Sequence, residues 1–170
     1  LDWTSKEIRS NLDFAVELKQ LTKEGKCPQL LQRKTFGLFF HKPSLRTRLS
    51  FEVGIAQLGG TAMVLSEQDF KIGERETVSD VARVMSRYVD GILIRTYSHQ
   101  MVLDLAKYST VPVVNMLTDF NHPCQVMSDM LTIKEKLGRI DEVRIAYVGD
   151  SNNMTNSWLN IAARIPLDLR

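Results

Sequence analysis

The sequence is short of the features that mark several large classes of protein. It has two cysteines, Cys27 and Cys124, far apart and in no metal-type spacing, so we expect free thiols and a reducing compartment. No apolar run approaches the roughly 18 residues needed to span a bilayer, and the N-terminus lacks the charged-then-apolar build of a signal peptide. The net charge of +2 is small, and no long Lys/Arg run favours nucleic acid. We expect a cytoplasmic protein without membrane or nucleic-acid partners, or an organelle-matrix protein if a transit peptide has been removed.

What the sequence does contain is an ordinary globular composition and a regular alternation of strand and helix patterns. Apolar residues make up 44% and charged residues 25% of the 170 residues, which fits one domain, or one domain and part of another. Short runs typical of buried strands lie at 34–40, 61–65, 91–94, 111–116 and 143–148, each followed by a helical pattern. This alternation predicts an α/β fold with a doubly wound parallel sheet.

The first helical pattern and the helix that ends at Gly138 indicate how the chain divides into domains. Thr4 and Glu7 form a capping-box pattern, and the apolar stripe that follows predicts a helix packed on the sheet. Gly138 ends a helix that starts near Pro123. We expect residues 1–138 to form one complete domain. Residues 139–170 would then supply the opening βα unit of a second, incomplete domain.

The segment 39–48 joins a strand end, a turn and a helix start in a pattern typical of anion sites. Ser44 is placed to cap the helix, and Thr47 would be its third residue. Amides in the first helical turn have no partner within the helix, and the helix dipole makes that end partly positive. Because Arg46 and Arg48 add like charge there, a bound phosphate would stabilise the arrangement. The alternative is that both arginines are solvated residues of an ordinary helix.

Further polar residues follow the later strands. Arg95 closes the strand at 91–94, and His122 and Gln125 follow the next one. Asn153 follows the strand after that. Ligands of doubly wound sheets bind beyond the carboxyl ends of the strands, so we expect these residues near the predicted phosphate site, where imidazole and carboxamide would polarise a small carbonyl or amide group. The three histidines show no ligand spacing, and we expect no metal site.

Two residues have alternative interpretations. Lys71, in the polar loop 66–76, either reaches the anion or is a solvated loop lysine. Cys124, two residues after His122, is the candidate nucleophile of a thiol-dependent hydrolase. Residues so close in sequence seldom place sulfur and imidazole in attack geometry, and no orienting partner is evident. We therefore expect Cys124 not to act as a nucleophile.

Four motifs in this order resemble the aspartate/ornithine carbamoyltransferase family, and its ornithine branch most closely. They are Ser44-Leu-Arg-Thr-Arg48, Ile94-Arg-Thr, His122-Pro-Cys-Gln125 and Gly149-Asp-Ser-Asn-Asn153-Met. The likeness extends over essentially all 170 residues and is more specific than any single motif. It implies an enzyme of arginine biosynthesis that transfers the carbamoyl group of carbamoyl phosphate to the side-chain amine of ornithine, giving citrulline and phosphate. It also implies a homotrimer and no cofactor.

The resemblance assigns roles to the candidate residues. Arg95, His122 and Thr47 would contact the carbonyl oxygen, where negative charge grows as the amine attacks. Gln125 would hold the carbamoyl nitrogen, and Asn153 would contact ornithine. The phosphate contacts are assigned to the helix start and one later loop residue: Ser44, Leu45, Arg46, Thr47, Arg48 and Lys71.

The chain departs from the family pattern at two positions and in one larger respect. The family usually has Thr where this chain has Leu45, and many relatives have Gln at Lys71, in a loop that reaches the neighbouring subunit. The later motifs that hold the ornithine amine are not among the 170 residues. We therefore expect weak binding of carbamoyl phosphate and little or no turnover. The alternatives are a non-catalytic phosphate-binding or assembly module, or a carbamoyltransferase for putrescine or aspartate.

Overall fold

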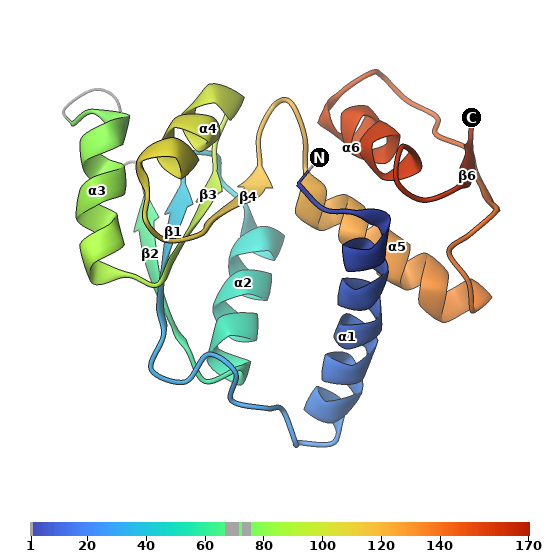
Figure 1. Cartoon of the computed structure of the whole chain (residues 1–170), viewed down its shortest axis with the longest axis horizontal. Coiled ribbons are helices and arrows are strands. Elements are labelled where there is room, and N and C mark those ends of the chain that lie inside the picture. The colour runs from blue at the N-terminus through green and yellow to red at the C-terminus, as the bar shows by residue number, and fades with distance from the viewer. Residues whose placement is uncertain (1, 67–71, 73–75) are drawn as a thin grey trace. The chain divides into compact units, whose positions relative to one another are not determined.

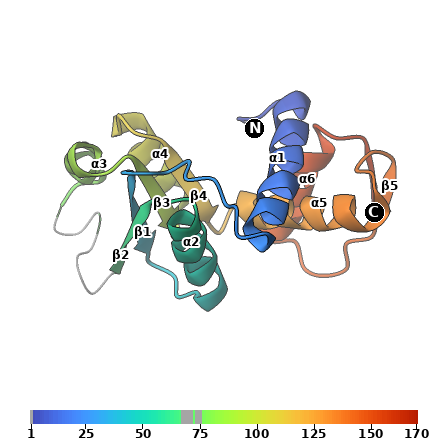
Figure 2. The same cartoon turned by 90° about the horizontal axis from the view of Figure 1, so that it is seen from below.

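A computed structural model of the chain describes residues 2–66, 72 and 76–170, and the chain divides into two compact units. The sheet unit comprises Pro28–Asp119, and the terminal unit combines Leu1–Cys27 with Phe120–Arg170. Figure 1 shows the elements of both units, and Figure 2 shows them from below. The division into domains 1–138 and 139–170 stays a prediction.

The sheet unit contains a four-stranded parallel sheet, which confirms the predicted fold class. Its strands are β1 (Thr35–Phe40), β2 (Thr61–Ser66), β3 (Gly91–Arg95) and β4 (Val113–Leu117), in the order β2-β1-β3-β4. Its helices are α2 (Leu45–Gln57), α3 (Val78–Tyr88) and α4 (His99–Tyr108). The chain runs from β1 outward to β2 and then returns to β3 on the other side of β1. The strand order therefore reverses between β1 and β3, where doubly wound sheets bind their ligands.

The central strands of this sheet, β1 and β3, are buried on both faces, as is usual for parallel strands. Successive side chains of a strand point to opposite faces, so Ile92 and Ile94 pack with Phe39 beneath α3 and α4. Leu93 packs with Leu38 on the other face, beneath α2. Figure 2 shows this layering, with α3 and α4 on one side of the strands and α2 on the other. This packing holds the start of α2 at the carboxyl edge of the sheet.

The terminal unit is built from three helices and a short parallel sheet. The helices are α1 (Ser5–Lys23), α5 (Pro123–Leu137) and α6 (Asn153–Ala162), and the strands are β5 (Val143–Ile145) and β6 (Leu167–Leu169). Thr4 and Glu7 form the predicted capping box of α1. The prediction that α1 packs on the main sheet is wrong, because Ile8 and Leu12 are buried against α5 and α6 instead. Among the described residues, no helix combines the length and apolar character needed to cross a membrane.

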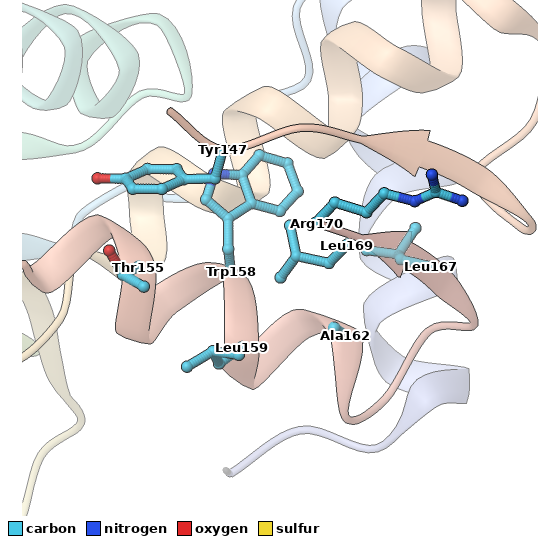
Figure 3. Close-up of a pocket in the computed structure, with 8 residues that line it drawn as sticks. All are labelled: Tyr147, Thr155, Trp158, Leu159, Ala162, Leu167, Leu169 and Arg170. Carbon is cyan, nitrogen blue, oxygen red and sulfur yellow. The ribbon is translucent and has the colours of Figure 1, made fainter. Parts of the chain in front are cut away.

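The terminal unit also differs from the predicted strand lengths. The expected strand at 143–148 ends at Ile145, and Val148 is 95% exposed. A further short strand, β6, pairs with β5 in parallel. A pocket of about 400 Å³ beside β6 and α6 is lined mainly by aromatic and aliphatic side chains, as Figure 3 shows. None of the predicted site residues lines it, and its one cation, Arg170, is paired with Asp168 at 2.9 Å. This pocket is an apolar packing surface and not the predicted anion site.

Candidate active site

The first turn of α2 carries the predicted phosphate ligands. Ser44 has an extended backbone, and its Oγ accepts a hydrogen bond from the Thr47 N–H at 3.2 Å, which confirms it as the N-cap. No acidic residue lies in this turn, although the helix dipole favours acids there. Leu45, the first helical residue, is 74% exposed and contributes nothing to the core. The turn thus presents backbone donors and cationic side chains without a carboxylate of its own.

The two arginines of this turn differ in their ion pairing. Arg48 Nε donates to Glu52 Oε2 at 3.2 Å, one turn along the helix. Arg46 is exposed, and no carboxylate among the described residues forms an ion pair with it. The Arg46 guanidinium is therefore the cation of this turn best able to accept an external anion.

Arg95 is joined directly to the connection between β1 and α2. It follows Leu93 by two residues in β3, so its side chain points to the face covered by α2. Its Nε donates to the Lys42 carbonyl at 3.2 Å, and its own carbonyl accepts from the His41 N–H at 3.0 Å. Burial lowers the pKa of the Arg95 guanidinium, so a nearby anion would stabilise its charge. Arg95 and the start of α2 consequently belong to one local structure at the reversal of strand order.

Two residues with no predicted role take part in this structure. His41 Nδ1 lies 3.1 Å from Thr96 Oγ1, and Thr96 is only 2% exposed. Thr96 directly follows β3 and Arg95. Their positions immediately after two neighbouring strands were the only signal available in the sequence.

Three further candidates, His122, Gln125 and Asn153, lie in the terminal unit, and Ser157, which also had no predicted role, links His122 to Asn153. The His122 N–H donates to Ser157 Oγ at 2.8 Å, and this hydroxyl donates to the Asn153 carbonyl at 2.6 Å. Ser157 is 1% exposed, so the link is buried. Gln125 lies in the first turn of α5, where its Nε2 donates to Asp129 Oδ1 at 2.9 Å. A serine inside a helix gives no sequence signal for such a role.

The predicted site residues thus form two groups. The sheet unit brings together the start of α2 and the end of β3: Ser44, Leu45, Arg46, Thr47, Arg48 and Arg95. The terminal unit holds His122, Gln125 and Asn153. Lys71 lies outside the described residues. That both groups act on one ligand stays a prediction.

The environment of Cys124 argues against thiol chemistry. Burial raises the pKa of its thiol to about 11. At pH 7 only about one molecule in 10⁴ would carry the thiolate, which is the nucleophilic form. A thiol-dependent hydrolase is therefore disfavoured.

Comparisons with known proteins agree with the resemblance seen in the motifs. The model of the aspartate/ornithine carbamoyltransferase, carbamoyl-P binding domain, matches residues 1–135. The ornithine carbamoyltransferase of Syntrophus aciditrophicus is 48% identical over 168 residues, which are 99% of this chain and 56% of that protein. The chloroplastic ornithine carbamoyltransferase of Pisum sativum is 49% identical over 97% of this chain and 44% of its own length.

Solved structures give the same result. The ornithine carbamoyltransferase of Pyrococcus furiosus superposes with a TM-score of 0.96 at 49% identity, covering 99% of this chain and 54% of that one. The mitochondrial enzyme of Coccidioides immitis gives a TM-score of 0.91 at 33% identity, covering 99% and 56%. The chain spans about half the length of the relatives it matches, and the predicted likeness to the ornithine branch is confirmed. The chain therefore belongs to the aspartate/ornithine carbamoyltransferase family, of which it contains the carbamoyl-P binding domain.

Proposed function

We propose that this chain is the carbamoyl phosphate-binding half of an ornithine carbamoyltransferase of arginine biosynthesis. The whole enzyme would transfer the carbamoyl group of carbamoyl phosphate to the side-chain amine of ornithine, releasing citrulline and phosphate. The observation that carries the proposal is the start of α2. It combines first-turn amides, two arginines and no carboxylate, and it lies beside Arg95 where the strand order reverses. The ornithine carbamoyltransferases that are 48–49% identical to the chain support the choice of reaction.

The phosphate would bind at the first turn of α2. The Ser44 hydroxyl, the amides from Leu45 onward and the Thr47 hydroxyl supply hydrogen bonds to its oxygens. Arg46 supplies charge as a fork of parallel N–H donors, and Arg48 adds a second guanidinium. The bound anion offsets both the arginine repulsion and the positive end of the helix dipole. Lys71 is proposed as a further phosphate ligand.

The chemical step would be attack of the ornithine amine on the carbonyl carbon. The new C–N bond forms as the carbonyl electrons move onto oxygen. The carbonyl then re-forms as the C–O bond to phosphate breaks, and the departing phosphate takes up the amine proton. Arg95, His122 and Thr47 would donate to the oxyanion, and losing one such donor costs about 2.7–4 kcal/mol of barrier. Gln125 would hold the carbamoyl nitrogen, and Asn153 would contact the ornithine backbone. Holding both reactants in place supplies the rest of the acceleration.

The chain by itself would bind the anion without completing the reaction. The relatives it matches are about twice as long, and we propose that the ornithine site and the active homotrimer need that additional length. We therefore expect phosphate and carbamoyl phosphate to bind the 170-residue chain, and citrulline to form slowly or not at all. Near-normal citrulline formation by this chain would contradict that expectation. The proposed location is the cytoplasm or an organelle matrix.

The test of the function is a calorimetric titration of the chain with phosphate and with fresh carbamoyl phosphate. Arg46→Ala should raise the Kd by about 10- to 150-fold, since a hydrogen bond to a charged group contributes about 1.5–3 kcal/mol. The matched control is Arg87→Ala, which removes the same charge from the last turn of α3. Affinity should remain within about twofold in the control. Equal binding by the Arg46→Ala variant and the unmodified chain would refute the proposed site.

A further inference from the structure

The connection at 41–44 determines where the phosphate-binding turn begins. Phe40 is the last residue of β1 and pairs with Arg95 of β3. The His41 N–H continues this ladder by donating to the Arg95 carbonyl at 3.0 Å, after which the connection leaves the sheet. Ser44 follows Lys42 by only two residues and caps α2. Any shift of this short connection therefore moves the first turn of α2 relative to Arg95.

His41 adds a side-chain link between this connection and a fixed point of the sheet. Its Nδ1 lies 3.1 Å from Thr96 Oγ1. Thr96 is 2% exposed, and its N–H donates to the Leu117 carbonyl at 3.0 Å, so its backbone is held by β4. The Thr96 hydroxyl also lies 3.7 Å from Met101 Sδ, and the imidazole tautomer determines whether His41 or Thr96 donates in the bond between them.

We propose that His41 is a positioning residue, whose bond to Thr96 holds the first turn of α2 beside Arg95 before the ligand arrives. This inference rests on the proposed function of that turn as a phosphate site. Arg46 and Arg95 carry like charges that repel each other in the absence of an anion. A connection this short, once released, would sample several conformations, and ordering it again would cost affinity on binding. A preorganised turn avoids that cost.

A second histidine–threonine pair in the same unit provides a matched control. His99 Nδ1 lies 3.1 Å from Thr118 Oγ1, and Thr118 is 0% exposed. This pair joins the first residue of α4 to the residue after β4. It repeats the chemistry and burial of the His41–Thr96 pair, and its tie to the connection is indirect, through the exposed Lys42–Asp119 ion pair at 3.4 Å. Its loss reports the general effect of breaking such a bond.

The affinity test is a titration with inorganic phosphate at pH 8, where an ordinary imidazole is neutral and its charge plays no part. His41→Ala and Thr96→Val should each raise the Kd by about two- to twelvefold, and the double variant by no more than either. His41→Asn and Thr96→Ser keep a donor and an acceptor and should restore affinity. His99→Ala should leave the Kd unchanged. An equal loss in His99→Ala would overturn the positioning role.

Amide hydrogen exchange without ligand separates this inference from the proposed function. His41→Ala should speed exchange at the amides of residues 45–48, and His99→Ala should not. If the unmodified chain binds no phosphate while His41→Ala still speeds this exchange, the proposed function fails and the positioning role stands. Unchanged exchange in His41→Ala overturns the positioning role. Thr96→Val breaks the same bond with little change in side-chain shape. If His41→Ala does not fold, the same exchange measurement on Thr96→Val tests the positioning role.

Discussion

Replacing Ser157 by alanine removes a hydroxyl that joins the loop before α5 to the first turn of α6. The hydroxyl oxygen accepts the His122 N–H at 2.8 Å, and its proton goes to the Asn153 carbonyl at 2.6 Å. Because Ser157 is 1% exposed, water cannot readily take its place. The substitution therefore leaves the His122 N–H without its Ser157 acceptor in a partly buried position.

The loss of stability in Ser157→Ala follows from the unsatisfied His122 N–H. Leaving one partner of a buried hydrogen bond unsatisfied costs about 1–3 kcal/mol, whereas the Asn153 carbonyl keeps its place in the helix. The unfolding constant should rise by about five- to 150-fold. The gain in helix propensity from Ser to Ala, about 0.5 kcal/mol, reduces the loss slightly.

The matched control is Ser128→Ala. Ser128 Oγ also donates to the carbonyl four residues earlier, that of Cys124 at 2.9 Å, but the side chain is exposed. Its loss should change the free energy of unfolding by no more than about 0.5 kcal/mol. Urea denaturation followed by circular dichroism measures both variants. A loss in Ser157→Ala no larger than that in Ser128→Ala would refute the reasoning.

Two further predictions concern protonation. Bidentate hydrogen bonds from Arg9, at 2.7 and 2.5 Å, hold the pKa of the Asp141 carboxyl below its usual range. The pair therefore contributes stability above the unfolded-state pKa, which is lost as the pH falls through the lower folded-state pKa. Asp141→Asn should destabilise the chain at pH 6 by no more than about 1 kcal/mol, because a partly exposed ion pair contributes little. At pH 2 the loss should be smaller, since the contribution of the pair falls with the pH. Urea denaturation midpoints at the two pH values measure both effects. With its pKa raised to about 11, Cys124 should alkylate slowly at pH 7, and its rate should still climb above pH 9. A rate that levels off near pH 9 would contradict the buried thiol.

The order of strands and helices was predictable because each element carries a local signal, whereas the face that a helix buries was not. Thr4, Ser44 and Thr77 cap helices as their sequence positions indicate, and Gly138 adopts the left-handed conformation that ends α5. The side chains that α4 buries depend instead on tertiary packing. Its apolar residues extend over more than half of the helix circumference, and Leu103 remains 50% exposed. The partners of α1 were missed for the same reason.

The same distinction between local signals and tertiary packing applies to the candidate site. Ser44, Arg46 and Arg95 could be placed at one edge because the carboxyl ends of parallel strands always meet there. The links through Thr96 and Ser157 could not, since each joins segments that are distant in the sequence. A buried hydroxyl is recruited by whatever donor the fold brings beside it. Sequence therefore predicts where the candidate ligand groups lie in the fold better than it predicts the groups that hold them in place.

This distinction also explains how the proposed phosphate motif can accommodate Leu45. Residues in a first helical turn offer an anion their backbone N–H, which every residue except proline possesses. The Leu45 side chain is 74% exposed, so it fills no packed space that the usual threonine would need. Replacing threonine by leucine removes one hydroxyl but leaves the amide, the dipole and both neighbouring arginines in place. In the proposed site, the backbone geometry set by Ser44 and the charge of Arg46 matter more than the side chain at position 45.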